Sequence, residues 1–535
     1  MTIFERTTHP AAEPDETRER RVGIPGSRRS PLFYQRRESL PVVSHGRGIY
    51  LYDVDGKEYL DGCSGAIAAN LGHANERIAK AAAEQLSKIA FTYRLQFENQ
   101  PANELAELLV QLSPPDLNRV FFVNSGSEAV ESAIKLARQY WWSSGKQGKS
   151  IFIARRPSYH GATLGGLAAT GYSALNIPFM PLTVTWPKIS APYCFHCPLN
   201  KTYPSCRVDC ANELQWAIDS YGADNIAAFI AEPIGGASTG AAVPPDEYFP
   251  MIEEICRKND ILLIIDDVMT GCGRTGTFFG YTHWDISPDI VVTSKGLAGG
   301  YTPIGAIICR DELVQAVMES GGFMHGHTFA GNPLSSAIAL EAVRIIVEDG
   351  LVENSRKVGT YLHERLHELK DRHIVIGDVR GRGLFAAIEF IRDRGTRRVF
   401  PPNWFVALEM TGFAKDHGLL LYPRRSLFGH SGDHVLIAPP LIIDEAGVDE
   451  LISRLERALI DLEKLLDRFV EREAAESGVT DRTFKRYSQD EHVPPWARAD
   501  LSDAKPVEHA NVTDVMNPVE PIWTGLEGEE DSEPE

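Results

Sequence analysis

Short apolar runs alternate along the chain with stretches whose apolar residues recur at helical spacing. The clearest runs are residues 151–154, 227–230, 261–265 and 290–292. Each has the length of a buried strand. Residues 129–137 and 335–347 instead carry apolar side chains three and four positions apart, which predicts helices. Because strands that alternate with helices pair into a mostly parallel sheet, the sequence predicts an α/β fold.

The two ends of the chain differ from its middle. Residues 1–30 are polar, contain three prolines and show no periodicity, which predicts an arm that is disordered or docks on a partner. Residues 475–535 are again polar and finish in an acidic run, which predicts a solvated tail. Before this tail, residues 445–473 form a helical stripe of Val448, Leu451, Ile452, Leu455, Leu459, Leu462, Leu466 and Phe469. We expect this helix to pack on the core of a C-terminal domain.

Two of the apolar runs lead into residues of complementary chemistry. The first ends in Asp266 and Asp267, and the second is followed by Ser294 and Lys295. If the runs are neighbouring strands, a carboxylate and an amine meet at one edge of the sheet. Pyridoxal 5'-phosphate needs this pair, because the amine can form a Schiff base with its aldehyde while the carboxylate keeps its pyridine nitrogen protonated. The sequence therefore predicts a pyridoxal-phosphate site at Asp266 and Lys295.

Other residues could complete such a site. Ser125, Gly126 and Ser127 open a predicted helix, and the free N–H groups at a helix start favour a phosphate. The ring of Tyr159 could lie flat on the pyridine, and Val268 could cover the opposite face. Together these residues would anchor the phosphate and sandwich the ring.

A possible dinucleotide motif lies in the same region. Residues 271–276, GCGRTG, satisfy the G-x-G-x-x-G pattern after a strand. A true fingerprint needs its glycines to open a helix, with an acidic residue about twenty positions later. Here Pro288 follows and the corresponding region runs into Thr293 and Lys295. We therefore do not predict a dinucleotide site.

Several blocks of the sequence resemble a known family. They are SGSEAVESAIKLAR, SYHGAT, AEPIGG, DDVMTGCGRTG, TSKGLAGG, HGHTFAGNPLSSAIAL and VRGRGLFAAIEF. In this order they resemble the signature blocks of class III aminotransferases, over about residues 32–470. One departure is Asp267, where the family more often has glutamate. The shorter side chain keeps the charge and leaves the prediction for Asp266 intact.

The resemblance implies a role for each cofactor residue. Lys295 would be the Schiff-base lysine and Asp266 the partner of the pyridine nitrogen. The other implied residues are Tyr159 and Val268 for the ring, Ser125, Gly126 and Ser127 for the phosphate, and Glu232 and His160 close to the ring. Thr328 would reach the phosphate of the neighbouring subunit. This last role implies a homodimer or a dimer of dimers with shared active sites.

The resemblance also implies a fold and a division into domains. The fold would be that of fold type I pyridoxal-phosphate transferases, with a mostly parallel seven-stranded sheet in a large domain and a smaller α+β domain. Residues 91–340 would form the large domain. The smaller domain would combine residues 31–90 with residues 341–474.

The substrate prediction depends on one substituted position. Relatives that act on ornithine or similar acids carry an arginine two positions before the A-P-P-L block, where this chain has Leu436. The missing carboxylate clamp favours donors such as β-alanine, taurine, 4-aminobutyrate or a terminal diamine, with pyruvate or else 2-oxoglutarate as acceptor. Arg424 and Arg425 are candidates for binding the acceptor carboxylate, whereas we expect Arg380 and Arg382 to be structural. Ping-pong transamination is the predicted reaction, and decarboxylation, racemisation or amine migration remain alternatives.

The composition fits a large globular enzyme. Its 535 residues exceed one ordinary domain, and a hydrophobic fraction of 43% supplies a large core. The formal net charge of -19 disfavours nucleic acids and anionic membranes as partners. No apolar run reaches the roughly 18 residues of a membrane span, and acidic residues near the start argue against a transit peptide. We therefore expect a cytoplasmic protein.

Four cysteines form an unexpected cluster in the sequence. Cys194, Cys197, Cys206 and Cys210 have the spacing C-x2-C-x8-C-x3-C. Four thiolates could bind a tetrahedral zinc ion, with His196 as an alternate ligand, and the reducing cytosol disfavours disulfides. The alternative is a loop of buried thiols without metal that covers the substrate channel. The predicted catalytic site itself contains no metal.

Overall fold

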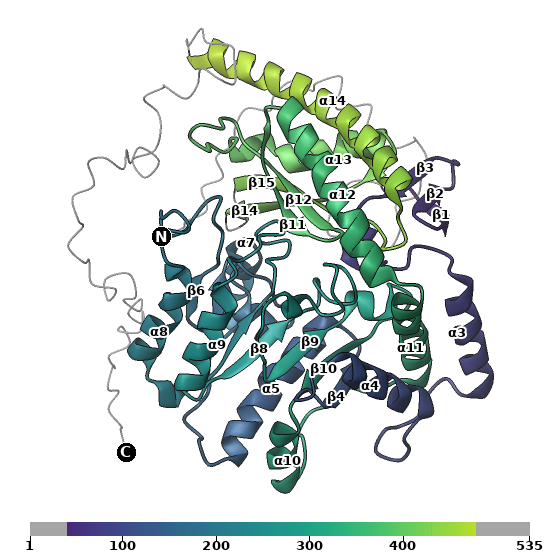
Figure 1. The fold of residues 1–535 in the computed structure, drawn as a ribbon, viewed down its shortest axis with the longest axis vertical. Helices are drawn as coiled ribbons and strands as arrows, with labels where there is room; N and C mark the ends of the chain where they lie inside the picture. Colours follow the sequence, from purple (N-terminus) through teal and green to yellow (C-terminus); the bar gives the residue numbers. More distant parts are fainter. Residues whose placement is uncertain (1–39, 428, 430, 478–535) are drawn as a thin grey trace, which may run out of the picture. The chain divides into compact units, whose positions relative to one another are not determined.

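The structure is a computed structural model that describes residues 40–477 except 428 and 430 (Figure 1). The predicted arm, residues 1–30, and the predicted acidic tail from residue 478 onward lie outside the described residues. All described residues belong to one compact unit. Within them, no helix is long and apolar enough to cross a membrane.

A seven-stranded sheet forms the centre of the fold, as predicted. In spatial order its strands are β4 (Arg119–Val123), β10 (Gly305–Cys309), β9 (Ile290–Thr293), β8 (Leu262–Asp266), β7 (Ile226–Ala231), β5 (Ile151–Arg156) and β6 (Lys188–Ser190). The pairs from β9 through to β6 are parallel, and β10 runs antiparallel to both of its neighbours. Every residue of β7, β8, β9 and β10 is buried, as expected for strands covered on both faces. The predicted α/β fold is thus confirmed.

Helices cover this sheet and connect its strands. The α-helices are α2 (Ser64–Ile67), α3 (Glu76–Lys88), α4 (Gln100–Leu112), α5 (Gly126–Ser143), α6 (Leu164–Ala169), α7 (Ser173–Asn176), α8 (Asp209–Tyr221), α9 (Tyr248–Lys258), α10 (Asp311–Glu319), α11 (Pro333–Glu348), α12 (Leu351–Arg372), α13 (Val406–Asp416) and α14 (Glu445–Ser477). Helix α5 contacts β4 and β7 through β10, so it crosses the sheet face (Figure 1). Its buried residues include Ala129, Val130, Ala133, Ile134 and Ala137, and the three alanines let the helix approach the strands closely.

Two smaller sheets complete the fold. One has the order β1 (Val43–Arg47), β2 (Tyr50–Asp53), β3 (Glu58–Asp61) and β13 (Leu419–Leu420). The other has the order β11 (Ile376–Arg382), β12 (Phe385–Phe390), β15 (Ser431–Ile437) and β14 (Tyr422–Leu427). Helix α14 packs on α12 and α13, and it buries the predicted stripe except for Phe469, whose ring lies 5.2 Å from that of Trp404.

One row of side chains crosses the sheet of β11, β12, β15 and β14. Asp378 is opposite Glu389, Glu389 is opposite His434, and His434 is opposite Arg424. Because residues directly opposite one another point to the same side of a sheet, these four side chains share one face. Two positions from His434 along β15, Leu436 shares this face and is opposite Tyr422.

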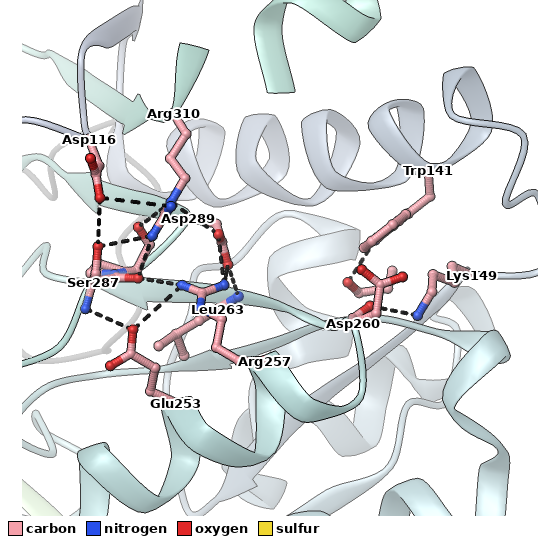
Figure 2. Close-up of polar contacts among 12 residues, drawn as sticks. Asp116, Trp141, Lys149, Glu253, Arg257, Asp260, Leu263, Ser287, Asp289 and Arg310 are labelled. Carbon is pink, nitrogen blue, oxygen red and sulfur yellow. Dashed lines mark hydrogen bonds and ion pairs between the residues drawn. The ribbon is translucent and has the colours of Figure 1, made fainter. Parts of the chain in front are cut away.

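A buried ion cluster stabilises the amino-terminal edge of the large sheet (Figure 2). Asp289 lies just before β9, and its carboxylate accepts from the Leu263 backbone N–H at 2.7 Å. It also forms ion pairs with Arg257 at 2.7 Å and Arg310 at 3.2 Å. Ser287 accepts hydrogen bonds from both guanidinium groups. Since the Asp289 side chain is only 3% exposed, these partners offset the cost of burying its charge.

Lys149 makes a second anchor at this edge (Figure 2). Its ammonium donates to the backbone carbonyl of Asp260 at 2.7 Å and lies 4.7 Å from the Trp141 ring. Burial lowers the pKa of the Lys149 amine. Both clusters are therefore structural, and they leave the opposite edge of the sheet free for chemistry.

Candidate active site

The predicted site residues follow the carboxyl ends of the strands of the large sheet. Ser125 follows β4, Tyr159 follows β5, Glu232 follows β7, Asp266 ends β8 and Lys295 follows β9. Strands β8 and β9 are parallel neighbours, with Asp266 opposite Val292. The carboxylate of Asp266 and the amine of Lys295 therefore follow adjacent strands, as the sequence predicted. Ligands of open parallel sheets bind at this edge.

Asp266 is held by a buried histidine. Nδ1 of His160 lies 2.8 Å from Oδ2 of Asp266, and the Val268 N–H donates to Oδ1 at 3.2 Å. The side chains of His160 and Asp266 are 0% and 6% exposed. Nε2 of His160 is buried and has no hydrogen-bond partner among the described residues. The carboxylate is therefore fixed in orientation, with a polar ring behind it.

Lys295 occupies a strained position. Its φ is +43°, in the left-handed region that side chains other than glycine adopt at a cost. Burial lowers the pKa of its amine to about 8, while the nearby carboxylates of Asp266 and Glu232 act in the opposite direction. In the described part of the chain, no group accepts a hydrogen bond from the amine. With this lowered pKa, a minor fraction of the amine is neutral at physiological pH, and this neutral form is available to a ligand.

Glu232 adds a second buried carboxyl group near the lysine. Its Oε1 accepts from the Gly236 N–H at 3.0 Å and its Oε2 from the Tyr159 N–H at 3.4 Å. Burial raises the pKa of Glu232, and the charges of His160 and Arg155 oppose this effect. Glu232 therefore ties the end of β7 to the turn that carries Tyr159.

The start of α5 forms a tight cradle. Ser125 is its N-cap and accepts from the Glu128 N–H at 3.2 Å. A Cβ on Gly126 would lie 3.1 Å from Cγ1 of Val268, and one on Gly161 would lie 2.8 Å from Oγ of Ser127. Gly161 also has φ of +118°. Only glycine suits these positions, so the backbone N–H groups at the helix start remain accessible to an anion.

These residues fit pyridoxal phosphate. The helix start offers N–H donors to a phosphate, Asp266 offers an anion to a pyridine nitrogen, and Lys295 offers a partly deprotonated amine. Tyr159 is 38% exposed, and burial raises the pKa of its hydroxyl. The contact of Val268 with Gly126 places Val268 beside the cradle. Both side chains thus lie near the space that the cofactor's ring would need.

Thr328 is the cofactor residue that was expected to serve a neighbouring subunit. It is exposed on the loop between α10 and α11, and it makes no polar contact within the described chain. Its neighbour His327 lies 3.8 Å from Glu128, in the first turn of α5. Within one chain, Thr328 is therefore at the surface, as a residue that serves a partner subunit would be.

The two candidate arginines point in opposite directions. Arg424 stacks on the Tyr422 ring at 4.4 Å, and its charge acts on both the Lys295 amine and the Tyr159 hydroxyl. Arg425 instead pairs with Asp433 at 3.3 Å and donates to the Pro402 carbonyl at 2.6 Å. Since neighbouring residues of a strand face opposite sides, only Arg424 is directed toward the site.

The GCGRTG segment has a structural role. Residues 271–276 form turns after β8 and open no helix, whereas the glycines of a dinucleotide fingerprint would open one. Arg274 is fully buried and donates to the carbonyls of Leu384 and Pro439 and to Oδ1 of Asn70. Asp267 turns away from Asp266 and accepts from the Gly280 N–H at 2.9 Å.

The cysteine loop shows no metal centre. Its four cysteines are free thiols that line one small cavity of about 20 Å³. No group of three or more His, Cys, Asp or Glu side chains in the described chain is arranged to hold a metal ion. His196, the alternate ligand of the hypothesis, belongs to no such group in the described chain, and its Nε2 lies 3.1 Å from Oε1 of Glu389.

The sequence reasoning missed Glu389 and its partners. Glu389 is fully buried in β12, and Arg380 pairs with it at 2.7 Å, which agrees with the structural role expected for that arginine. One signal was present, because a glutamate inside the apolar run FAAIEF must find a partner if the run is buried.

Comparisons with known proteins agree with this geometry. A sequence profile described as Aminotransferase class-III matches residues 33–459. The uncharacterized aminotransferase YodT of Bacillus subtilis is 43% identical over 80% of this chain and 97% of its own length. The putrescine–pyruvate aminotransferase of Pseudomonas aeruginosa is 35% identical over 78% of this chain and 90% of its own length. The PLP-bound structure of an amine transaminase from an uncultivated Pseudomonas species has a TM-score of 0.76 and 32% identity, and it covers 82% of this chain and 98% of that one. The chain therefore belongs to the class III aminotransferases, a family of fold type I enzymes that depend on pyridoxal phosphate.

Proposed function

We propose that this aminotransferase moves the amino group of a terminal amine, or of a β- or ω-amino acid, to an oxo acid such as pyruvate. The observation that carries the proposal is that Arg424 and Leu436 lie on the same face of one sheet, where Arg424 is opposite His434 and Leu436 is opposite Tyr422. Leu436 is fully buried, and because its side chain is a hydrocarbon, this position offers no charge to a substrate carboxylate. The likeness to a putrescine–pyruvate aminotransferase supports the same substrate class.

We assign the cofactor to the residues at the carboxyl edge of the large sheet. Lys295 would bind its aldehyde and Asp266 its pyridine nitrogen. The remaining assignments are Ser125, Gly126 and Ser127 for the phosphate, Tyr159 and Val268 for the ring faces, His160 and Glu232 beside the ring, and Thr328 for the phosphate of a partner subunit. When bound, pyridoxal phosphate carries the amino group between two half-reactions and stabilises negative charge at the donor carbon.

The chain's own residues then act in defined ways. Nζ of Lys295 takes a proton from the donor carbon and returns one to the acceptor, and a pKa of about 8 suits this exchange near neutral pH. His160, whose Nδ1 lies 2.8 Å from Asp266, and the Val268 N–H, which donates to it, hold the Asp266 carboxylate in place for the pyridine nitrogen. Arg424 binds the carboxylate of the oxo acid. A terminal amine brings no carboxylate at this position, so the same pocket accepts both substrates in turn.

We also propose a homodimer in which Thr328 completes the partner's site. Large apolar side chains are exposed around the loop of Thr328, including Leu95 at 74%, Met324 at 75% and Phe329 at 58%. Phe91 packs on Phe329 at 5.6 Å, so residues 91–97 and 324–329 form one surface. An exposed apolar surface of this kind is typical of a subunit interface. Light scattering on the purified protein tests the dimer.

Absorption spectroscopy tests the activity. The protein loaded with pyridoxal phosphate is titrated with β-alanine, taurine, 4-aminobutyrate and a terminal diamine, beside Lys295→Ala as control. We expect a visible cofactor band that the variant lacks, that one donor bleaches and that pyruvate restores. Release of carbon dioxide instead of a carbonyl product would indicate decarboxylation. Restoration by 2-oxoglutarate but not by pyruvate would overturn the proposed acceptor.

A further inference from the structure

Glu389 is the centre of a buried polar cluster that joins the cysteine loop to the sheet of β11, β12, β15 and β14. Oε2 lies 2.7 Å from Nη2 of Arg380 and accepts from the Tyr193 hydroxyl. Oε1 lies 3.1 Å from Nε2 of His196 and accepts from the Ser426 hydroxyl at 3.4 Å. The side chain of Glu389 is 0% exposed. A fully buried carboxylate with four partners is fixed in one orientation.

The partners come from segments that the chain brings together from far apart. Tyr193 and His196 belong to the loop between β6 and α8, beside the large sheet. Arg380 lies in β11 and also donates to the Thr239 carbonyl at 2.8 Å, in the segment that follows Glu232. Burial acts to raise the pKa of Glu389, but the charges of Arg380 and His196 outweigh it and hold the pKa at about 2. Glu389 therefore stays ionised, and the Arg380 guanidinium balances its charge.

Strand β14 connects this cluster to Arg424. The Tyr193 hydroxyl lies 3.0 Å from that of Ser426, which also donates to the Gly432 carbonyl at 3.1 Å. Ser426 is two residues after Arg424 in the same strand, so both side chains face the same side. Glu389 also shares the cross-strand row of His434 and Arg424. The contacts of Ser426 thus fix the position of β14. The position of β14 in turn determines where the Arg424 side chain extends.

His434 strengthens this connection. It stands between Glu389 and Arg424 in the row, is fully buried, and its Nε2 lies 3.1 Å from the Ala237 carbonyl. A Cβ on Gly240 would lie 2.8 Å from Cδ2 of His434, so backbone and ring are in close contact. Close packing of this kind leaves the row little freedom to shift. Displacing one member would therefore displace the others.

We propose that Glu389 is a positioning residue for the acceptor: its carboxylate holds β14 against Tyr193 so that Arg424 meets the carboxylate of the incoming oxo acid. The inference rests on the proposed acceptor role of Arg424. Glu389 itself touches neither substrate nor cofactor. It should therefore affect the half-reaction with the oxo acid and leave the half-reaction with the amine donor intact.

The test compares the two half-reactions in Glu389→Gln and in a matched control. Glutamine keeps the shape of the side chain and removes its charge. We expect the KM for pyruvate to rise about tenfold, because a displacement of about 1 Å at a binding group can cost this much or more, while the rate constant with the amine donor changes less than about twofold. Asp289→Asn removes another buried carboxylate with two arginine partners, at the opposite edge of the sheet. It should lower the melting temperature but change neither half-reaction.

A double variant separates this inference from the proposed function. In an Arg424→Leu background, Glu389→Gln should raise the KM for pyruvate no further, because the effect of Glu389 passes through Arg424. If Arg424→Leu alone leaves the KM for pyruvate unchanged, the proposed acceptor role of Arg424 is refuted. The proposed role of Glu389, which depends on it, is then refuted as well. If Arg424→Leu raises this KM but Glu389→Gln does not, or if Glu389→Gln slows both half-reactions alike, only the inference about Glu389 is overturned.

A milder variant serves if Glu389→Gln does not fold. Tyr193→Phe keeps the aromatic ring and removes the hydroxyl that bridges Glu389 and Ser426. We expect a rise of about threefold in the KM for pyruvate, in keeping with the loss of one hydrogen bond, and no change with the amine donor. An unchanged KM for pyruvate in a folded Tyr193→Phe protein would also refute the proposal.

Discussion

Replacing Lys295 with methionine should make the cofactor-free protein more stable at neutral pH. Burial lowers the pKa of the amine from 10.5 to about 8, although Asp266 and Glu232 oppose this effect. Because one pKa unit corresponds to about 1.4 kcal/mol, the buried charge destabilises the folded chain by about 3 kcal/mol. This value is an upper limit, since the partly exposed side chain retains some contact with water. Methionine has a similar length and carries no charge.

The gain should depend on pH in a defined direction. Below pH 8 the amine is protonated in both the folded and the unfolded chain, so the full cost of the buried charge is present. Between pH 8 and 10.5 the folded chain releases its proton first, and the stability of the wild type rises with pH. The advantage of Lys295→Met should therefore be largest near pH 7 and vanish near pH 10.5.

Urea unfolding of the cofactor-free proteins at several pH values measures this difference. Lys80→Met is the matched control, because the side chain of Lys80 is 76% exposed and the same substitution there should give no pH-dependent gain. A Lys295→Met protein no more stable than the wild type at pH 7 would refute the reasoning. An advantage that persists unchanged at pH 10.5 would assign the gain to packing and not to charge.

Three further substitutions test other parts of the structure. Arg274→Met should lower the free energy of unfolding by roughly 3–5 kcal/mol, because buried acceptors such as the Leu384 carbonyl lose their donor, and calorimetry measures it. Asp266→Asn should weaken cofactor binding about tenfold or more and reduce kcat by about a hundredfold; an unchanged cofactor titration would contradict its assignment. Tyr422→Phe removes the hydroxyl that accepts a hydrogen bond from Arg424 at 2.5 Å. It should raise the KM for pyruvate about fivefold in steady-state assays, while the KM for the amine donor stays constant.

Local patterns were sufficient to predict the strands of the site. The runs that end near Asp266 and Lys295 are apolar because both faces of their strands are buried, and this burial is visible in the sequence. The helix after Asn332 was predicted at 335–347 and extends over Pro333–Glu348, since the asparagine caps it through the Ser335 N–H. Such signals need only neighbouring residues.

Features that depend on pairing across the chain were not predictable in the same way. Arg424 and Arg425 are equivalent in the sequence, and only the pairing of β14 with β15 decides which one faces the site. Glu389 finds its partners at Tyr193, Arg380 and Ser426, and no local spacing encodes such distant contacts. His196 was considered as an alternate metal ligand because the sequence shows its neighbouring cysteines but not its contact with the distant Glu389.

The ion cluster around Asp289 gives this enzyme a place for engineering that is separate from its chemistry. It joins α9, β8 and the turn before β9 at the amino-terminal edge of the large sheet, and none of its partners is a site residue. Effects of substitutions at distant positions without shared partners are usually additive. Changes that strengthen this edge should therefore raise heat tolerance without altering substrate preference, and variants evolved for new amines at the other edge could be combined with them.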